Sequence, residues 1–592
     1  MHALDALKAF WILGVFLFLF FGLPAHLFSG RPNSPGVMRI AGNWARTVLC
    51  VTILVFLLSS LRVLSAITVV LLVLGALGFG WLRKRAGMPS HLLMSLQATT
   101  INMIREVESR SFGRYLLPRK RAPVSARPRG EVRVHQWLRV FEGRELLVAC
   151  FAVALGTTVV LRAEHAVREL RFDQPEQYSA LLRARELMLN SHPAARPFVF
   201  PAVIGATSLL SSTDPMQVTR FLTPVVGLLV VLATGLLIHV CTRAGVACVA
   251  AIYCLGAAVL PPARNETGVA MSAMEKLQIV FSGSSATIRP RPEFAFGLLF
   301  LLLALALLAD WYRNSRGWDS LLDFTCCLLL AGIISEVLLV VLMMSAGILL
   351  LRPMAGLFAF VTLCYGWAAY ATLSTGITVP DEVSTLLPVS AAMVVGCFLA
   401  MIEAEFVART GRRAETVLLA ACLCVAMIWL RPQRLRGRYL EYEAAARVTQ
   451  EIASRFPRQT WAVAAPVEQL AETLGLGGHE DLAGFVEKYR SQVSSPEFFF
   501  QDAREDLFIY VEKKPFQMFS REPETVSFSV LKDPVYRNYR SPGGRASLEA
   551  AAEQLCERYW QYHPNVDVFF ENEDLRIYHI HQQQTSATKT GH

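Results

Sequence analysis

The chain has 592 residues, of which 54% are hydrophobic and only 18% are charged, and its mean hydropathy is +0.40. This composition is too apolar for a soluble protein of several domains and indicates that a membrane is the solvent for much of the chain. The formal net charge is +10, and residues 83–144 alone hold fourteen Lys and Arg residues with only four Glu residues. Beside apolar segments, such a stretch indicates topology and attraction to anionic lipid rather than nucleic-acid binding.

Apolar runs long enough to cross a hydrocarbon core, which takes about 20 residues, recur through the first 431 residues and do not occur after them. No small-x-small cleavage site follows the first run, so we expect a retained helix rather than a signal peptide. Candidate helices lie at 9–29, 46–62, 64–82, 144–162, 218–241, 245–261, 292–310, 319–335, 337–351, 354–373, 386–403 and 415–431. The predicted fold class is a polytopic α-helical membrane protein of about 12 spans with a C-terminal soluble α+β domain.

The positive-inside rule orients these helices, because Lys and Arg in short loops beside membrane spans stay in the cytoplasm. It places the basic segment 83–144 inside and residues 163–217 outside. Within that outer segment, the apolar run 197–212 is shorter than a span and carries Pro201, so we expect a helix on the outer surface. Counting it as a span would invert the orientation of everything downstream.

One choice decides which side the C-terminal region occupies. A single helix over 322–351 would bury Glu336 at bilayer depth, at a cost of about 3 kcal/mol, whereas two short helices would leave Glu336 near the outer face. We favour two helices, and the arginines that follow the last span, within 431–438, then lie outside, against the positive-inside rule. The prediction is a protein of the cell (inner) membrane whose C-terminal domain is periplasmic or extracellular.

The sequence divides into three predicted regions. Residues 1–143 form a three-helix membrane extension with a basic cytoplasmic loop, 144–431 form the membrane core with outward loops 163–217 and 261–292, and 432–592 form the soluble domain. In the soluble domain, strands are predicted at 460–466, 506–514, 566–570 and 575–580, and helices at 440–455, 466–474, 480–491 and 545–562. The polar tail 581–592 is predicted to be disordered.

Cysteine and histidine spacing points to no metal site, and no cofactor is evident. Eleven of the twelve cysteines lie in or beside apolar runs, and only Cys556 lies in the soluble region, which excludes a disulfide framework there. The run His479-Glu480-Asp481 is interpreted as a helix start rather than a metal site.

The first outward loop combines an acidic residue with several arginines. Asp173 precedes Pro175, an arrangement typical of a helix start, and its carboxylate would then cap a helix over 175–189. The alternative is catalytic, because a carboxylate at the membrane surface can deprotonate a hydroxyl while arginines hold a phosphate. The arginines of this loop are Arg171, Arg183, Arg185 and Arg196. Spacing alone leaves both interpretations open.

The arrangement of this loop resembles the GT-C superfamily of membrane glycosyltransferases, which take a sugar from a polyprenyl-phosphate carrier at the outer face of the membrane. The similarity covers residues from 144 to the end of the chain. It rests on an Asp-x-x-x-x-Tyr-x-x-x-x-Arg run, a proline-rich stretch and a segment that returns to the membrane behind an arginine, carried here by Asp173, Tyr178, Arg183, His192, Pro193, Pro197, Pro201 and Arg220.

This resemblance implies that Asp173 is the catalytic acid or base and that Tyr178, Arg183 and Arg220 contact the substrates. The paired acidic motif of the superfamily is incomplete here, because Gln174 follows Asp173 and the next carboxylate is Glu176. We expect Glu176 to take part in substrate binding.

A second outward loop, 261–292, is predicted to face the same compartment. Its end, Arg-Pro-Arg-Pro-Glu, is typical of a sequence that anchors a helix at the lipid headgroups. Alternatively, Arg289 and Arg291 bind the lipid phosphate, Glu266 contributes to substrate binding, and Glu293 assists Asp173.

Two functions follow from these patterns. The first is an inverting glycosyltransferase that moves a sugar from a polyprenyl-phosphate donor to a protein, lipid or glycan acceptor. The alternative is a non-catalytic transporter, lipid flippase or assembly scaffold, for which Asp323 and Glu336 are nearly the only intramembrane charges. The segments FIYVEKKPF and VFFENEDLRIYHI also resemble those of a bacterial group of uncharacterised many-span proteins, which implies a shared architecture and no assigned activity.

Overall fold

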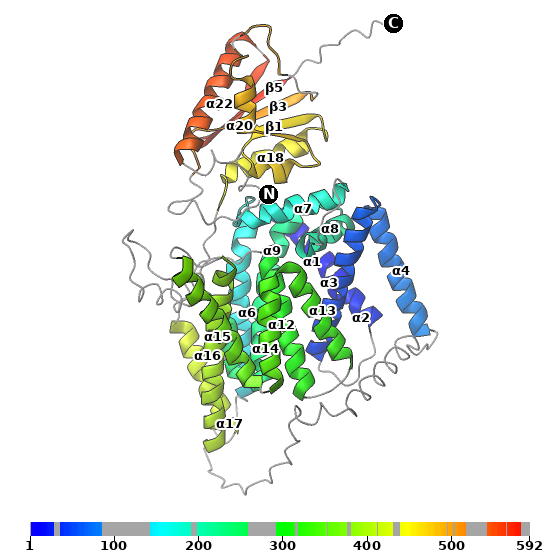
Figure 1. Cartoon of the computed structure of the whole chain (residues 1–592), viewed down its shortest axis with the longest axis vertical. Coiled ribbons are helices and arrows are strands. Elements are labelled where there is room, and N and C mark those ends of the chain that lie inside the picture. The colour runs from blue at the N-terminus through cyan, green and yellow to red at the C-terminus, as the bar shows by residue number, and fades with distance from the viewer. Residues whose placement is uncertain are drawn as a thin grey trace.

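The computed structural model describes residues 2–28, 36–85, 143–190, 198–257, 292–313, 318–351, 353–375, 381–410, 412–429, 439–493, 495–500, 504–516, 542–563 and 565–581. A bundle of long helices carries a smaller domain at one end (Figure 1). In chain order the bundle contains α1 (His2–Leu17), η1 (Phe18–Gly22), α2 (Leu23–Leu27), α3 (Gly36–Ser60), α4 (Ala66–Arg85), α6 (Gly143–Arg168), α7 (Pro175–Leu189), α8 (Val199–Ser211), α9 (Pro215–Thr242), α10 (Gly245–Gly256), α12 (Pro292–Arg313), α13 (Trp318–Ile334), α14 (Glu336–Leu351), α15 (Pro353–Thr375), α16 (Asp381–Thr410) and α17 (Arg412–Trp429).

Six helices of the described residues are long and apolar enough to cross a membrane. They are Ala6–Leu27, Gly36–Ser60, Leu146–Arg168, Pro215–Thr242, Pro292–Arg313 and Leu386–Glu405, and shorter apolar helices accompany them. The structure therefore confirms a mostly helical, membrane-associated protein with a small C-terminal sheet. The count of about 12 spans stays a prediction.

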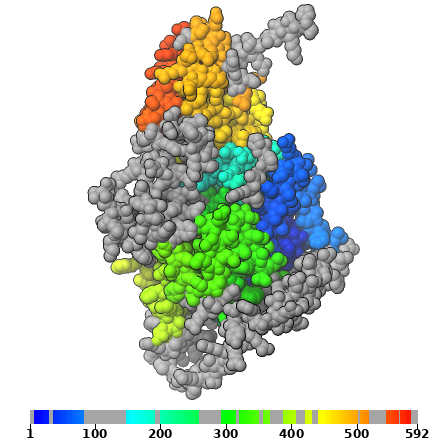
Figure 2. All heavy atoms as spheres, viewed as in Figure 1, coloured from blue at the N-terminus to red at the C-terminus, as the bar shows by residue number. Residues whose placement is uncertain are grey.

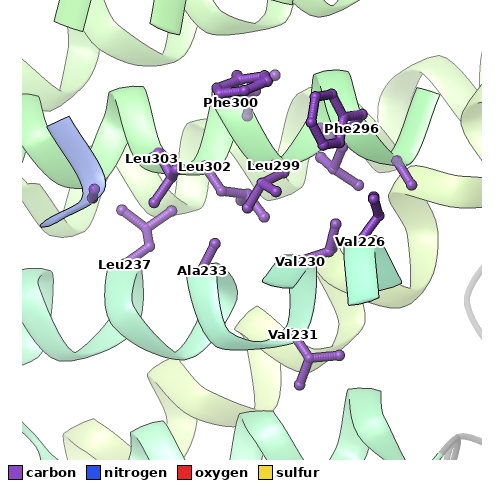
Figure 3. Close-up of a cluster of buried hydrophobic side chains, with 14 of the residues drawn as sticks. Val226, Val230, Val231, Ala233, Leu237, Phe296, Leu299, Phe300, Leu302 and Leu303 are labelled. Carbon is purple, nitrogen blue, oxygen red and sulfur yellow. The ribbon is translucent and has the colours of Figure 1, made fainter. Parts of the chain in front are cut away.

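The central helix of the bundle is α12, whose apolar segment is 94% buried. A helix that is apolar all round is expected inside a bundle, surrounded by other helices. Its neighbour α9 presents a side chain toward it every three or four residues, so the two helices meet along one continuous seam (Figure 3). The seam joins Val226, Val230, Ala233 and Leu237 of α9 to Phe296, Leu299 and Leu303 of α12.

Two features bear on the predicted topology. Helices α13 and α14 are separate, with Ser335 between them, so the two-helix interpretation of 322–351 is confirmed. The prediction that 197–212 lies on the outer surface is wrong in one respect. Helix α8 has 13 residues, too few to span a membrane, but it is buried among α1, α3, α7 and α9. Its uniformly apolar sequence explains the burial, because it offers no polar face to water.

The C-terminal domain is a mixed sheet with helices on both faces. Its elements are α18 (Glu443–Arg455), β1 (Trp461–Ala465), α19 (Glu468–Thr473), β2 (Gly478–Asp481), α20 (Leu482–Tyr489), β3 (Asp506–Glu512), α22 (Pro542–Tyr562), β4 (Val566–Glu571) and β5 (Leu575–His581). The strand order is β2-β1-β3-β5-β4. Strands β2, β1 and β3 are parallel, and β5 is antiparallel to both β3 and β4.

The alternation of side chains along the central strands explains the two helical layers. Ala462 and Ile509 belong to the core shared with α20 and α22, whereas Val463 and Phe508 belong to the core beneath α18. Four of the five strands coincide with predicted ones, and β2 was not predicted. Asp481 both ends β2 and caps α20 by accepting a hydrogen bond from the Gly484 N–H, so the expected helix start is confirmed.

The C-terminal domain rests on the end of the bundle formed by α7 (Figure 2). A mixed apolar cluster joins the two, with Phe172, Leu181 and Met216 from the bundle and Leu440 and Val467 from the domain. The domain therefore lies at the same end of the bundle as the loop between α6 and α9.

A buried arginine ties the helical layers of the domain to the sheet. Arg545 of α22 donates from Nε and Nη2 to both carboxylate oxygens of Glu512, at 2.8 and 2.7 Å. Its Nη1 donates to Glu468 at 3.2 Å, and Glu549 accepts the Glu512 backbone N–H at 2.8 Å. Removing the only cation of this group would leave buried carboxylates without a counter-charge.

We therefore expect Arg545→Ala to destabilise the C-terminal domain by about 3 to 5 kcal/mol, the cost of breaking a buried pair. The rate at which a maleimide modifies buried Cys556 in the full chain, followed by peptide mass spectrometry, measures this opening. Arg576→Ala is the matched control, since its pairs with Glu571 and Glu553 are more exposed and such pairs contribute about 1 kcal/mol or less. Equal protection of Cys556 in both variants would contradict the proposed role of Arg545.

Candidate functional site

The link between α6 and α7 places Asp173 at the base of the C-terminal domain. The helix cap is Gln174, which exchanges capping hydrogen bonds with Gln177, and Gln177 Oε1 accepts the backbone N–H of both Asp173 and Gln174 at 3.1 Å. Asp173 is therefore not the N-cap of α7, and the predicted capping role of its carboxylate is wrong. Its carboxylate is buried, with 1% of the residue exposed, and it lines a cavity instead.

The cavity lies where the ends of three long helices meet. Its wall comprises Arg162, His165 and Ala166 of α6, Arg171, Phe172 and Asp173 of the link, Gln177 of α7, Arg220, Thr223, Pro224 and Gly227 of α9, and Pro292 and Ala295 of α12. Its volume is about 30 Å³, room for about two water-sized groups. Three arginines and one carboxylate give the wall a positive balance, so the cavity suits a small anionic group such as part of a phosphate.

Two of these arginines are held by the helices themselves. Gly227 faces Arg162, and a Cβ at position 227 would lie 2.6 Å from Nη1 of that arginine, so glycine is needed for this approach. Arg220 donates to Gln217 Oε1 at 3.3 Å and to the carbonyl of Val167 at 3.4 Å. Both side chains are almost fully buried, so their charge acts in a medium of low dielectric constant.

The C-terminal domain positions the third arginine. The Arg171 guanidinium lies 3.7 Å from the centre of the Tyr439 ring and donates from Nη1 to the carbonyl of Glu441 at 3.1 Å. His165 contacts the same tyrosine ring and bonds through Nε2 to the carbonyl of Arg171 at 2.9 Å. Residues that follow the last helix of the bundle thus hold one arginine of the cavity wall in place.

The structure sorts the predicted site residues into three groups. Asp173 and Arg220 meet in the cavity. Arg183 lies 3.9 Å from Glu293 and stacks on Phe198, next to the cavity rather than in its wall. The predicted contacts of Glu266, Arg289 and Arg291 lie outside the described residues.

Two further residues that were predicted to contact the substrate lie outside the cavity wall. The Tyr178 hydroxyl is fully buried and donates to Glu441, so Tyr178 joins the loop to the C-terminal domain and does not line the cavity. Glu176 is not part of the cavity wall either. The sequence analysis missed Arg162 and His165, although a buried arginine near the end of an apolar run is a signal of function.

A group of buried carboxylates lies directly behind the cavity, where α19 meets α7. Glu441 accepts from the Tyr178 hydroxyl and from Gln469 Nε2, the latter at 2.5 Å. Burial, and then the charge of Glu472, raise the pKa of Glu441 well above its ordinary value. Burial also raises the pKa of Glu472 to about 7, although the charge of Arg185 opposes this shift. This contact region therefore holds protons at pH values where free glutamates have lost them.

Comparison with protein families, with characterised proteins and with solved structures finds no match for this chain. The geometry of the cavity consequently carries the functional conclusion alone.

The raised pKa of Glu472 predicts that the C-terminal domain loses stability as the pH rises. The folded carboxyl stays protonated up to about pH 7, whereas the unfolded one ionises near 4.5, so the folded state binds more protons between these values. Its stabilising contribution is complete below pH 4.5 and is lost as the pH rises through 7, by about 1.4 kcal/mol per pH unit in that window.

Glu472→Gln removes this titrating proton. We therefore expect the protection of Cys556 to fall less steeply between pH 5 and pH 8 than in the unsubstituted chain, in a series sampled about every half pH unit. Glu487→Gln, at an exposed position of α20, is the control and should keep the original slope. A Glu472→Gln profile that matches the control would show that this carboxyl does not titrate with folding.

Proposed function

We propose that this chain is a membrane glycosyltransferase that moves a sugar from a polyprenyl-phosphate carrier to a hydroxyl acceptor. One observation carries the proposal: Asp173 shares a cavity with Arg162, Arg171 and Arg220 where helices α6, α9 and α12 meet. A carboxylate beside several cations provides a proton acceptor and an anion site within one cavity. The resemblance of the loop to the GT-C superfamily agrees with this arrangement.

In the proposed reaction the acceptor oxygen attacks the anomeric carbon of the sugar. The bond between that carbon and the phosphate oxygen breaks, and its electron pair leaves with the polyprenyl phosphate. Asp173 takes the proton of the acceptor hydroxyl, and the three arginines stabilise the negative charge that develops on the phosphate. Attack from the face opposite the leaving group inverts the anomeric configuration.

The surroundings of the cavity suit a lipid-linked donor. Helix α6, which contributes Arg162 and His165, exposes large apolar side chains along its length, among them Val153, Val160 and Val167. A polyprenyl chain can therefore lie against α6 in the hydrocarbon layer with its phosphate at the arginines. A cavity of about 30 Å³ does not admit a sugar ring, so donor binding requires the wall to open.

The transporter alternative has less support among the described residues. Asp323, one of the two intramembrane charges expected to line a path, bonds to Arg46 Nε at 2.5 Å, and a Cβ on Gly42 would overlap its carboxylate. This is a close-packed ion pair between α13 and α3. Transport requires charged groups along a route through the bundle, and a fixed pair near one end does not provide one.

Replacing Asp173 with Asn keeps the shape of the side chain and removes the proton acceptor. We expect Asp173→Asn to lower sugar transfer by about 100- to 10,000-fold, the contribution of general base catalysis. Transfer is measured in membranes with a panel of polyprenyl-phosphate hexoses labelled in the sugar. Asp319→Asn, at an exposed carboxylate of α13, is the matched control and should transfer at the original rate.

Donor binding separates the roles of the cavity residues. Native mass spectrometry with a short-chain polyprenyl phosphate should show a bound lipid in the unsubstituted chain and in Asp173→Asn, and a weaker complex in Arg220→Gln. Unchanged transfer by Asp173→Asn, with every donor of the panel that the chain uses, would refute the assignment of the base. Equal lipid binding by Arg220→Gln would refute the phosphate site.

The proposed reaction places the cavity and the C-terminal domain outside the cell membrane. A cysteine at Gln554, an exposed position of α22, should then react with a membrane-impermeant maleimide in intact cells. A cysteine at Glu405, near the α16–α17 turn at the far end of the bundle, should react only after the cells are permeabilised (Figure 1). The reverse pattern would put the domain in the cytoplasm and exclude transfer at the outer face.

A further inference from the structure

One end of the C-terminal sheet brings together side chains that are far apart in the sequence. Asp506 begins β3 and pairs across the strands with His581, which ends β5. His579 is two residues earlier on β5, so its side chain lies on the same face of the sheet as that of His581. On β4, Asp567 pairs with His579. The register of three strands thus places two histidines and two aspartates together.

Both imidazole rings point their nitrogens at the same carboxylate. His579 Nε2 lies 2.8 Å from Asp506 Oδ1, and His581 Nδ1 lies 3.0 Å from the same oxygen. The three potential ligand atoms, one from each residue, all lie within 4.8 Å of one another. In a tetrahedral zinc site with bonds of about 2.0 to 2.1 Å, neighbouring ligand atoms are about 3.4 Å apart. Widening the two contacts by about half an ångström would therefore admit an ion.

The orientation of His579 is fixed by neighbours that leave one nitrogen for coordination. Its Nδ1 lies 3.0 Å from Asp567 Oδ1, and its ring stacks on Phe508 at 4.6 Å with an angle of 9°. A histidine that binds a metal usually donates its other N–H to a carboxylate, which sets the tautomer and the ring orientation. With the proton on Nδ1 facing Asp567, Nε2 is the nitrogen directed at Asp506.

The end of β5 is also held in place. The His581 backbone N–H donates to the carbonyl of Asn565 at 3.3 Å, and Asn565 Nδ2 donates to the carbonyl of His581 at 2.7 Å. The His581 side chain remains 63% exposed, so a metal at this position would keep a coordination site open to water.

We propose that Asp506, His579 and His581 bind a zinc ion, with water as the fourth ligand and Asp567 orienting His579. Two imidazoles and one carboxylate are ligands that zinc accepts in sites of this kind. The ion would join the start of β3 to the end of β5, two neighbouring strands inside the sheet, and thereby secure the strand end at which the described chain stops. This site is separate from the cavity at Asp173, and the proposal does not depend on glycosyl transfer.

No metal site is predicted from the sequence, because the ligands are not close together along the chain. Asp506 precedes His579 by 73 residues, and only the His-x-His pair at 579 and 581 is visible as a local pattern. In a strand, this spacing puts both rings on one face, whereas in a helix it would not.

The test uses the full chain in detergent after removal of metals with a chelator. Titration calorimetry with Zn²⁺ should show one site that His581→Ala weakens by at least about 100-fold, and Asp567→Asn should weaken it by about 10- to 100-fold. His581 is suited to removal because its exposed side chain leaves the core intact. Asp574→Asn, a carboxylate in the β4–β5 turn outside the cluster, should bind zinc like the unsubstituted chain.

Substitution with Co²⁺ identifies the ligands independently. The expected visible spectrum is that of nitrogen and oxygen ligands, without the thiolate bands that binding at a cysteine would produce, and His581→Ala should abolish it. Cys556 protection in each variant verifies that the domain is folded. Zinc binding that survives both His581→Ala and Asp506→Asn would refute the site. Tighter binding of Fe²⁺ than of Zn²⁺ would refute zinc as its ion, since two histidines and one carboxylate also suit iron.

Discussion

The Glu443 carboxylate holds together the parts of the chain on which the rest of the site depends. It accepts the backbone N–H of Leu170 at 2.9 and 3.1 Å and that of Arg171 at 3.1 Å. These N–H groups belong to the irregular link between α6 and α7, which provides them with no helical partner, and buried backbone donors must find an acceptor. By supplying one, the first turn of α18 determines the course of the link and hence the position of Asp173.

The same contact region lets the C-terminal domain position one residue of the cavity wall. Arg171 is held by Glu169, whose carboxylate accepts from Nε at 2.7 Å, and by the ring of Tyr439 and the carbonyl of Glu441 from the domain. Behind it, Tyr178 and Gln469 satisfy a buried carboxyl that would be costly to leave without hydrogen bonds. A group of buried polar side chains thus lies where the bundle meets the domain, whereas α12 at the centre of the bundle is almost wholly apolar.

The features that the sequence predicts are those set by residues close together along the chain. Apolar length and strand alternation are local, so the long helices and strands β1, β3, β4 and β5 were predictable. Strand β2 was not, because Gly478–Asp481 has no apolar alternation and is a strand only through its pairing with β1. Asp173, which lines the cavity, was singled out from the local pattern of the loop around it, and its catalytic role stays a prediction. The contacts of Glu443 and Tyr439 with the link between α6 and α7 were not predicted. Polar residues that follow a last apolar run have the composition of a linker, and their partners lie about 270 residues earlier in the chain.

The contact between the loop and the domain also constrains the topology independently of charge. Since Arg171 and Glu441 touch, the chain must cross the membrane an even number of times between them. Helices α9, α12 and α16 between them hold segments long enough to cross, and shorter apolar helices lie among them, so the number of crossings stays a prediction. Fusing α13 with α14, or adding α8 as a span, would change the parity of that number. The contact therefore requires the link at Arg171 and the start of the C-terminal domain to lie on the same side of the membrane, because a hydrogen bond cannot join groups on opposite sides of it.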